Sequence, residues 1–281
     1  MCCVMIEIDR VEEHEKFLGS DKMQQLHILW EETALSSVSD STRALRHFLA
    51  RLSELNGCSG ATWLALNKYE ADALPSSLAP FQSIITELGG WVVAASVCLD
   101  PQKDADIEHE RWFMYAAKGG PDHMTDHMCA NAGNARSCIR HDVMTEEEWQ
   151  YHWFPSKYLS FYGIGERMMM MFPVNGHCES CILIDRPRGA PAFAAADKHF
   201  WHHAMAGIPY LHKQLCAERG VLGFTEPLTR REVETYRLLL TPMSESEIGS
   251  KMNLSTHTVH DYARRLYRKL GVRGRVGLMS M

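Results

Sequence analysis

The stretch from Leu228 to Gly271 reads LTRREVETYRLLLTPMSESEIGSKMNLSTHTVHDYARRLYRKLG, and it decides the fold of the C-terminal part of the chain. It contains three residues of the type that caps the first turn of a helix: Thr229, Ser244 and Ser255. Glu232 and Glu247 follow the first two caps by three residues, which is the spacing of a capping box. Gly271 is typical of the left-handed residue that ends a helix. We therefore expect three short helices joined by tight turns, as in a helix-turn-helix unit.

The third expected helix has two chemically different sides. Its apolar residues recur at spacings of four, three and four and form one stripe: Val259, Ala263, Leu266 and Leu270. The opposite stripe is polar and mostly basic, with Arg265 and Lys269 at its flanks: His257, His260, Asp261, Arg264 and Arg268. A helix that packs on one side and presents cations on the other can lie in the major groove of DNA.

The same stretch resembles the LuxR-type helix-turn-helix family. The resemblance is carried by segments along its whole length: Leu228-Thr229-Arg230-Arg231-Glu232, Ser246-Glu247-Ile248, Leu254-Ser255, Thr258-Val259 and Leu266-Tyr267-Arg268-Lys269-Leu270-Gly271-Val272 with Arg275. It implies sequence-specific DNA binding, with base contacts from His260, Asp261 and Arg264. The phosphate contacts that it implies come from five other residues: Lys251, Thr258, Arg265, Arg268 and Lys269.

Two departures from the family pattern affect this expected DNA surface. His260 stands where lysine is frequent, and Asp261 puts a carboxylate on the face that meets DNA. A carboxylate can accept a hydrogen bond from a cytosine amino group, but phosphates repel it. The family pattern therefore predicts DNA binding, while these residues predict an unusual recognition site.

The distribution of charge and a group of helix-breaking residues divide the chain into two parts. Residues 225–281 hold ten Lys/Arg and six Asp/Glu, a net charge of +4, whereas residues 1–224 hold nineteen and twenty-nine, a net charge of −10. Between them, Gly220, Gly223 and Pro227 interrupt the helical pattern. We expect a sensor domain over residues 1–220 and a DNA-binding domain over residues 225–281, the basic part being the one that meets a polyanion.

The larger part has the pattern of a mixed α/β domain. Apolar spacing predicts helices around residues 23–30 and 45–55, the second ended by Asn56-Gly57, and one long helix over about 194–217. Shorter helices are expected at 121–131, 146–151 and 155–161. Strands are expected in five segments: 61–66, 91–99, 111–117, 167–174 and 179–185. Asn175-Gly176 predicts a hairpin between the last two strands.

Residues 145–215 resemble the second half of a GAF-like sensor domain. The resemblance rests on Glu146-Glu147-Glu148-Trp149, Tyr158-Leu159, Gly163-Ile164, the strand pair, Asp185-Arg186, Phe193 and Asp197. It implies an antiparallel sheet with helices and a sensing role. The chain opens without the paired acidic residues of a phosphoacceptor receiver domain. The Trp-x-x-x-Tyr element of acyl-homoserine-lactone domains is also missing, since Asn67 follows Trp63 and Trp153 follows Trp149 at that spacing.

The residues of this domain suggest two alternative kinds of small-molecule site. Aromatic side chains between residues 149 and 162 predict either an apolar ligand pocket or core packing under the sheet: Trp149, Trp153, Phe154, Tyr158 and Tyr162. His123 and His127, one helical turn apart, could share a metal ion, although fifteen histidines make such pairs common by chance. Cys178 and Cys181 are three residues apart, so if both lie on one strand they point to opposite faces and do not suit shared ligation. The residues identify no cofactor.

The favoured function is a DNA-binding transcriptional regulator whose N-terminal domain senses a ligand or partner. The alternatives are a signalling module whose C-terminal helices bind a protein, and a regulator with an autoinducer-like ligand pocket. No nucleophile elbow or phosphate loop suggests an enzyme. Nine irregularly spaced cysteines and the absence of a long apolar run predict a cytoplasmic protein without membrane contact. We expect a homodimer, and because few residues remain after Arg275 for a fourth helix, we expect the N-terminal domain to hold it.

Overall fold

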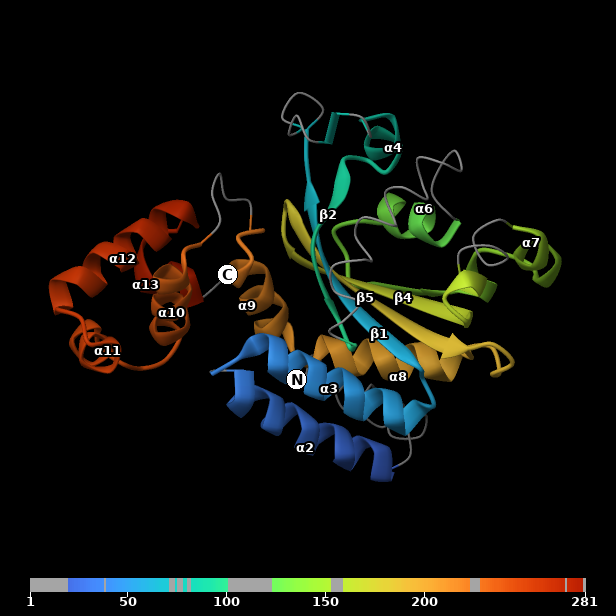
Figure 1. Ribbon diagram of the computed structural model, residues 1–281, viewed down its shortest axis with the longest axis horizontal. Coiled ribbons are helices and arrows are strands. Elements are labelled where there is room, and N and C mark those ends of the chain that lie inside the picture. Colours follow the sequence, from blue (N-terminus) through green and yellow to red (C-terminus); the bar gives the residue numbers. More distant parts are fainter. Residues whose placement is uncertain are drawn as a thin grey trace, which may run out of the picture.

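The computed structural model describes residues 20–37, 39–70, 74, 78–79, 82–100, 123–152, 159–222, 228–270 and 272–279. They form a mixed α/β part with one antiparallel sheet and a smaller part made only of helices (Figure 1). The fold class expected from the sequence is confirmed. None of the helices in these described segments is long and apolar enough to cross a membrane.

Five strands make up the sheet: β1 (Gly60–Lys68), β2 (Trp91–Cys98), β3 (Arg136–Ile139), β4 (Ile164–Asn175) and β5 (Cys178–Pro187). Their order is β2-β1-β5-β4-β3, and each neighbouring pair is antiparallel. β4 and β5 form the predicted hairpin, in which Asn175 is opposite Cys178. The expected strand at residues 111–117 lies outside the described residues. The short edge strand β3 was not predicted.

Helices cover both faces of the sheet (Figure 1). On one face lie α3 (Ser41–Asn56), α8 (Ala195–Ala206) and α9 (Pro209–Glu218), with α2 (Ser20–Ser37) packed on α3. The other face carries three shorter helices: α4 (Gln82–Glu87), α6 (His123–Ala130) and α7 (Glu146–Tyr151). Gly57, with φ of 61°, ends α3 in the left-handed conformation as predicted.

Strand alternation separates the two apolar cores of this part. Met168 and Met170 belong to the core under α3, α8 and α9, whereas Met169 and Met171 belong to the core under α6 and α7. All four methionines are buried. Cys178 lies in the first core and Cys181 in the second, so the prediction that these two thiols point to opposite faces is confirmed.

The prediction of one helix over 194–217 is wrong, because the chain breaks between α8 and α9. Pro209 has no N–H to donate and occupies the start of α9, where that donor is not needed. Gly207 precedes it, and a Cβ there would lie 2.2 Å from the Trp30 ring. Trp30 also donates from Nε1 to the Ala204 carbonyl at 2.9 Å, which fixes α2 against the end of α8.

A chain of buried polar groups crosses the first core. The Trp63 indole N–H donates to Ser180 Oγ at 2.6 Å, and Ser180 Oγ lies 2.7 Å from His212 Nδ1. His212 Nε2 is 3.0 Å from the Met205 carbonyl. A carbonyl can only accept, so Nε2 carries the proton and Nδ1 accepts from Ser180. Burial lowers the pKa of His212 to about 4, and the ring is neutral at neutral pH.

The C-terminal helices are α10 (Arg230–Leu239), α11 (Glu245–Met252), α12 (Thr256–Lys269) and α13 (Gly274–Met279). The three predicted caps are confirmed: Thr229 and Ser244 accept from the N–H groups of their capping-box glutamates, and Ser255 accepts from Thr258 N. Asn253, with φ of 54°, makes the left-handed turn between α11 and α12. Gly271 lies outside the described residues.

Candidate nucleic-acid interface

The helix α12 is held by its apolar stripe and shows its cations to solvent. Val259, Ala263 and Leu266 are fully buried against α10 and α11. The opposite side is exposed along the helix at five residues: His257, His260, Arg264, Arg265 and Arg268. Among the residues that the structure describes, neither Arg264 nor Arg268 has an ion-pair partner. Both guanidinium groups are therefore available to an external anion.

The first half of α12 has a different charge pattern. Asp261 Oδ2 lies 3.7 Å from His257 Nε2, and His260 Nδ1 lies 3.0 Å from Glu245 Oε2 on α11. The half-buried Thr258 is 2.7 Å from the Ser255 hydroxyl, so its side chain supports the helix cap. Carboxylates thus accompany both histidines, while uncompensated cations gather toward the C-terminal half.

Lys269 is placed differently from the expectation that it contacts phosphate. Its ammonium donates to Glu232 Oε2 at 2.8 Å, and only 15% of its side chain is exposed. Burial alone would raise the pKa of Glu232, but hydrogen bonds from Lys269 and Thr229 outweigh it and lower that pKa. The Lys269–Glu232 pair therefore fixes the end of α12 to the start of α10, and we assign Lys269 a structural role.

The remaining predicted phosphate contacts lie on two sides of the helical part. The Arg265 guanidinium lies 5.1 Å from the Tyr262 ring centre, on the exposed flank of α12. Lys251 is exposed on α11, and it lines a cleft toward the α/β part rather than the face of α12. Of the two lysines predicted to contact phosphate, Lys251 thus lies on α11 and Lys269 is paired with Glu232 at the end of α12.

Residues 226–281 match the model of the family described as bacterial regulatory proteins, luxR family. Residues 226–281 are a LuxR-family domain. No curated protein matches the chain. The family-model match names the same family as the resemblance on which the DNA-binding expectation rested.

Solved structures similar to large parts of the chain have low identity to it. Escherichia coli SdiA has 11% identity and a TM-score of 0.39, covering 89% of this chain and 94% of that chain. SdiA in complex with octanoyl-rac-glycerol has 10% identity and a TM-score of 0.45, covering 92% and 93%. The VqsR LBD domain from Pseudomonas aeruginosa has 12% identity and a TM-score of 0.42, covering 69% and 96%. The match to the luxR family covers residues 226–281 alone.

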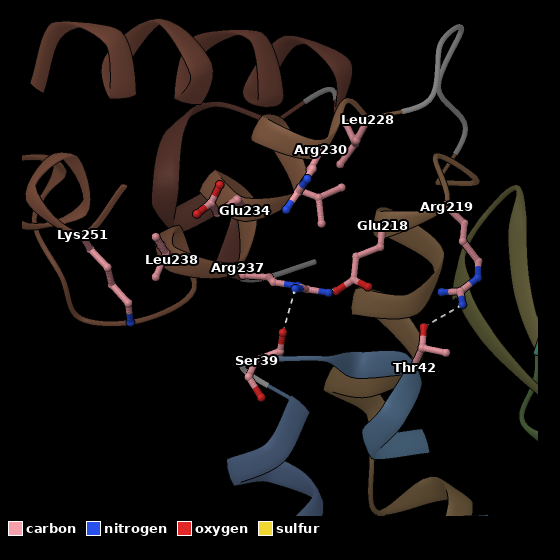
Figure 2. A pocket seen from close by; sticks show the side chains of 11 residues that line it. Ser39, Thr42, Glu218, Arg219, Leu228, Arg230, Glu234, Arg237, Leu238 and Lys251 are labelled. Carbon is pink, nitrogen blue, oxygen red and sulfur yellow. Dashed lines mark hydrogen bonds and ion pairs between the residues drawn. The ribbon is translucent and has the colours of Figure 1, made fainter. Parts of the chain in front are cut away.

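The LuxR-family domain is joined to the α/β part by a charged contact that sequence reasoning missed. Arg237 of α10 donates from Nε to Glu218 Oε1 of α9 at 2.7 Å, and from Nη1 to the Ser39 carbonyl at 3.1 Å (Figure 2). Glu218 also accepts from Gln214 Nε2 at 3.0 Å and from the Ser41 hydroxyl. With its side chain only 9% exposed, Glu218 ties α9, the start of α3 and α10 together.

On the opposite face of the sheet, the structure describes two of the five residues expected to line an aromatic pocket. Trp149 is buried, with the Arg140 guanidinium 5.7 Å from its ring centre, and Tyr162 packs at the edge of the same core. Trp153, Phe154 and Tyr158 lie outside the described residues. A separate apolar cavity of about 40 Å³ opens nearby, and its walls include Leu64, Leu66, Trp91, Cys129, Met169 and Met171. Neither Trp149 nor Tyr162 lines it.

The structure gives no support to the metal alternative. His123 and His127 are both exposed on α6, and the His123 ring packs edge-on against His152 at 5.2 Å. In the described part of the chain no three His, Cys, Asp or Glu side chains converge as metal ligands would. Burial raises the pKa of Cys129 to about 12, so that thiol stays protonated at neutral pH.

Proposed function

We propose that this chain is a sequence-specific DNA-binding transcriptional regulator that uses α12 as its recognition helix. The observation that carries the proposal is the exposed position of Arg264 and Arg268 on a helix whose other side is fully buried. Positive groups on one face of a firmly packed helix suit the major groove of DNA. The match of residues 226–281 to the luxR family supports the same function.

In this function the residues of α12 fall into two groups, those that contact bases and those that contact phosphates. Arg264 reaches a base edge, for which a bidentate contact to guanine is the commonest arginine choice. His260 and Asp261 lie nearer the helix start and read neighbouring bases, while Arg265 and Arg268 contact phosphates. Thr258 is a further phosphate contact, whereas Lys251 lies toward the cleft beside the α/β part. Two copies of the chain would read half-sites about one turn of DNA apart.

For the α/β part, residues 1–220 in our division of the chain, we propose a sensing role through a small apolar ligand. The support is the composition of the core under α6 and α7, which combines methionine, cysteine and aromatic side chains. The cavity beside Cys129 measures only about 40 Å³, so a ligand would have to enlarge it. Methionine-rich linings adapt to ligand shape more readily than branched side chains do. Trp149 is a buried member of this core and Tyr162 packs against it, and both remain candidates for the ligand site.

The decisive experiment is the salt dependence of binding by the full chain. A duplex site would first be selected from a random library, and its affinity measured by fluorescence anisotropy over a range of KCl concentrations. With about four to six phosphate contacts, the logarithm of the binding constant should fall with the logarithm of salt at a slope near −4 to −5.

The alternative function makes the opposite prediction. Docking of the C-terminal helices onto a protein through apolar side chains should change little with salt. Failure to select any duplex sequence, or a slope near zero for the best one, would refute the DNA-binding proposal. A strong slope with equal affinity for all duplexes would keep DNA binding but remove sequence specificity.

A further inference from the structure

The cleft between the LuxR-family domain and the α/β part has the size and the lining of a ligand site. Its volume is about 840 Å³, within the range of small-molecule pockets. Both parts of the chain contribute walls, as Figure 2 shows: Ser39, Thr42, Glu218 and Arg219 come from one part, and Arg230, Glu234, Arg237 and Lys251 are among those from the other.

The charge balance of this lining favours an anion. Four cationic and two carboxylate side chains line the cleft. Both carboxylates already have cationic partners, since Glu218 pairs with Arg237 and Glu234 pairs with Arg231, which is outside the lining. Within the described part of the chain, the ion pairs leave Arg230 and Lys251 without a carboxylate. The lining therefore carries an excess of positive charge.

The cations of the cleft differ in how firmly they are held. Arg219 donates from Nη2 to Thr42 Oγ1 at 2.9 Å, and its guanidinium lies 5.1 Å from the Trp63 ring centre, so its position is fixed. Arg230 and Lys251 are exposed and can move toward a ligand. One fixed arginine on one part and two adjustable cations on the other make a cleft that an anion would bridge.

We propose that this cleft binds a small polyanion bearing phosphate or carboxylate groups, held by Arg219 on one side and by Arg230 and Lys251 on the other. Such a ligand contacts both parts of the chain, so it stabilises their docked arrangement by binding to it alone. The site is separate from the face of α12 and from the apolar core of the α/β part, and it goes beyond the function proposed above.

The test is direct binding to the full chain by isothermal titration calorimetry at constant ionic strength, with pyrophosphate, ATP and citrate as probes. We expect at least one probe to bind saturably, with one site per chain. The order of the three affinities distinguishes a preference for phosphate from a preference for carboxylate ligands. Arg230→Gln should weaken the affinity for the probe about fivefold or more, because one charge contact is lost. Glu234→Gln should strengthen it, because a carboxylate leaves the lining. Both residues are on the surface of α10, so the fold should survive either change.

Arg273→Gln is the matched control, because Arg273 is an exposed arginine of the same domain outside the cleft. It should leave probe affinity unchanged. Equal weakening by Arg230→Gln and Arg273→Gln would show general charge screening and overturn the proposal. The proposal also fails if no probe saturates by about 10 mM. Stoichiometric displacement of a bound probe by duplex DNA would assign these cations to the DNA surface instead.

Discussion

Arg237 and Glu218 form an ion pair at 2.7 Å across the junction of the two parts of the chain, where 23% and 9% of their side chains are exposed. Buried side chains continue on both sides of this pair, so that one apolar cluster runs from the sheet through α9 into the LuxR-family domain. Polar and apolar contacts together hold α10 on α9. The ion pair gives the contact its direction, because apolar packing is non-directional and alone would allow α10 to slide along α9.

Arg237→Gln should loosen this junction. Removing the guanidinium leaves the Glu218 carboxylate half-satisfied in a largely buried place, which should cost about 1–3 kcal/mol in the free energy of unfolding. A double-mutant cycle with Glu218→Gln, measured by urea unfolding, should show coupling of at least about 0.5 kcal/mol. Small-angle X-ray scattering should show a larger radius of gyration. Arg231→Gln is the control, because it removes an exposed pair on the same helix and should change stability by less than about 1 kcal/mol.

Arg264→Ala and Arg268→Ala should impair DNA binding in different ways. Loss of Arg264 should weaken the selected site by about 1–3 kcal/mol and relax its sequence preference. Loss of Arg268 should weaken all sequences alike and make the salt slope shallower by about 1. Arg51→Ala, an exposed arginine on α3, is the control and should have no effect. If neither α12 variant changes DNA affinity, sequence preference or the salt slope, the proposed docking of this helix is wrong.

Asp261→Asn should increase affinity for non-specific DNA. It removes a carboxylate that faces the phosphates beside the cations of α12, and we expect a gain of about threefold to tenfold. If Asp261 also accepts from a cytosine amino group, the ratio of specific to non-specific affinity should fall. Competition binding assays with the selected duplex and a scrambled one measure both quantities. Glu54→Gln on the exposed side of α3 should leave them unchanged.

His212 should make the fold sensitive to acid. Its pKa in the folded chain is about 4, against 6.5 in the unfolded chain, so the unfolded state takes up the proton first. The contribution to stability is complete above about pH 7 and is lost as the pH falls toward 4, with on the order of 2 kcal/mol lost by about pH 5. Urea unfolding at about pH 7.5 and about pH 5 should show a smaller difference for His212→Asn. Equal differences for the variant and the unchanged chain would assign acid sensitivity to other groups.

Gly207→Ala should destabilise the α/β part through a steric clash. The new methyl group would lie 2.2 Å from the Trp30 ring, which is itself fixed by its bond to the Ala204 carbonyl. We expect a loss of about 1–3 kcal/mol in thermal or urea unfolding. Gly176→Ala in the β4–β5 turn is the matched control, because a methyl group added there would have no atom within 4 Å. Similar losses at both glycines would contradict the role of Trp30.

Local signals explain what could be read from the sequence. The caps Thr229, Ser244 and Ser255 and the Asn175-Gly176 turn act within a few residues, so their prediction does not need the tertiary structure. β3 escaped prediction because it is only four residues long and exists through its pairing with β4. The helix break at Pro209 was missed because apolar spacing continues across it. No local sequence pattern predicts the pairing of Glu218 with Arg237, because only the packing of α9 on α10 brings them together.

Residues of α10 and α11 line the cleft, and no described residue of α12 lines it. In Figure 1, α12 lies on the outer side of its domain, away from the sheet. The reading surface is therefore uncovered in the docked arrangement. Under the proposed function, a signal received by the α/β part would act by changing the position and angle of α12 relative to DNA, and not by exposing that helix.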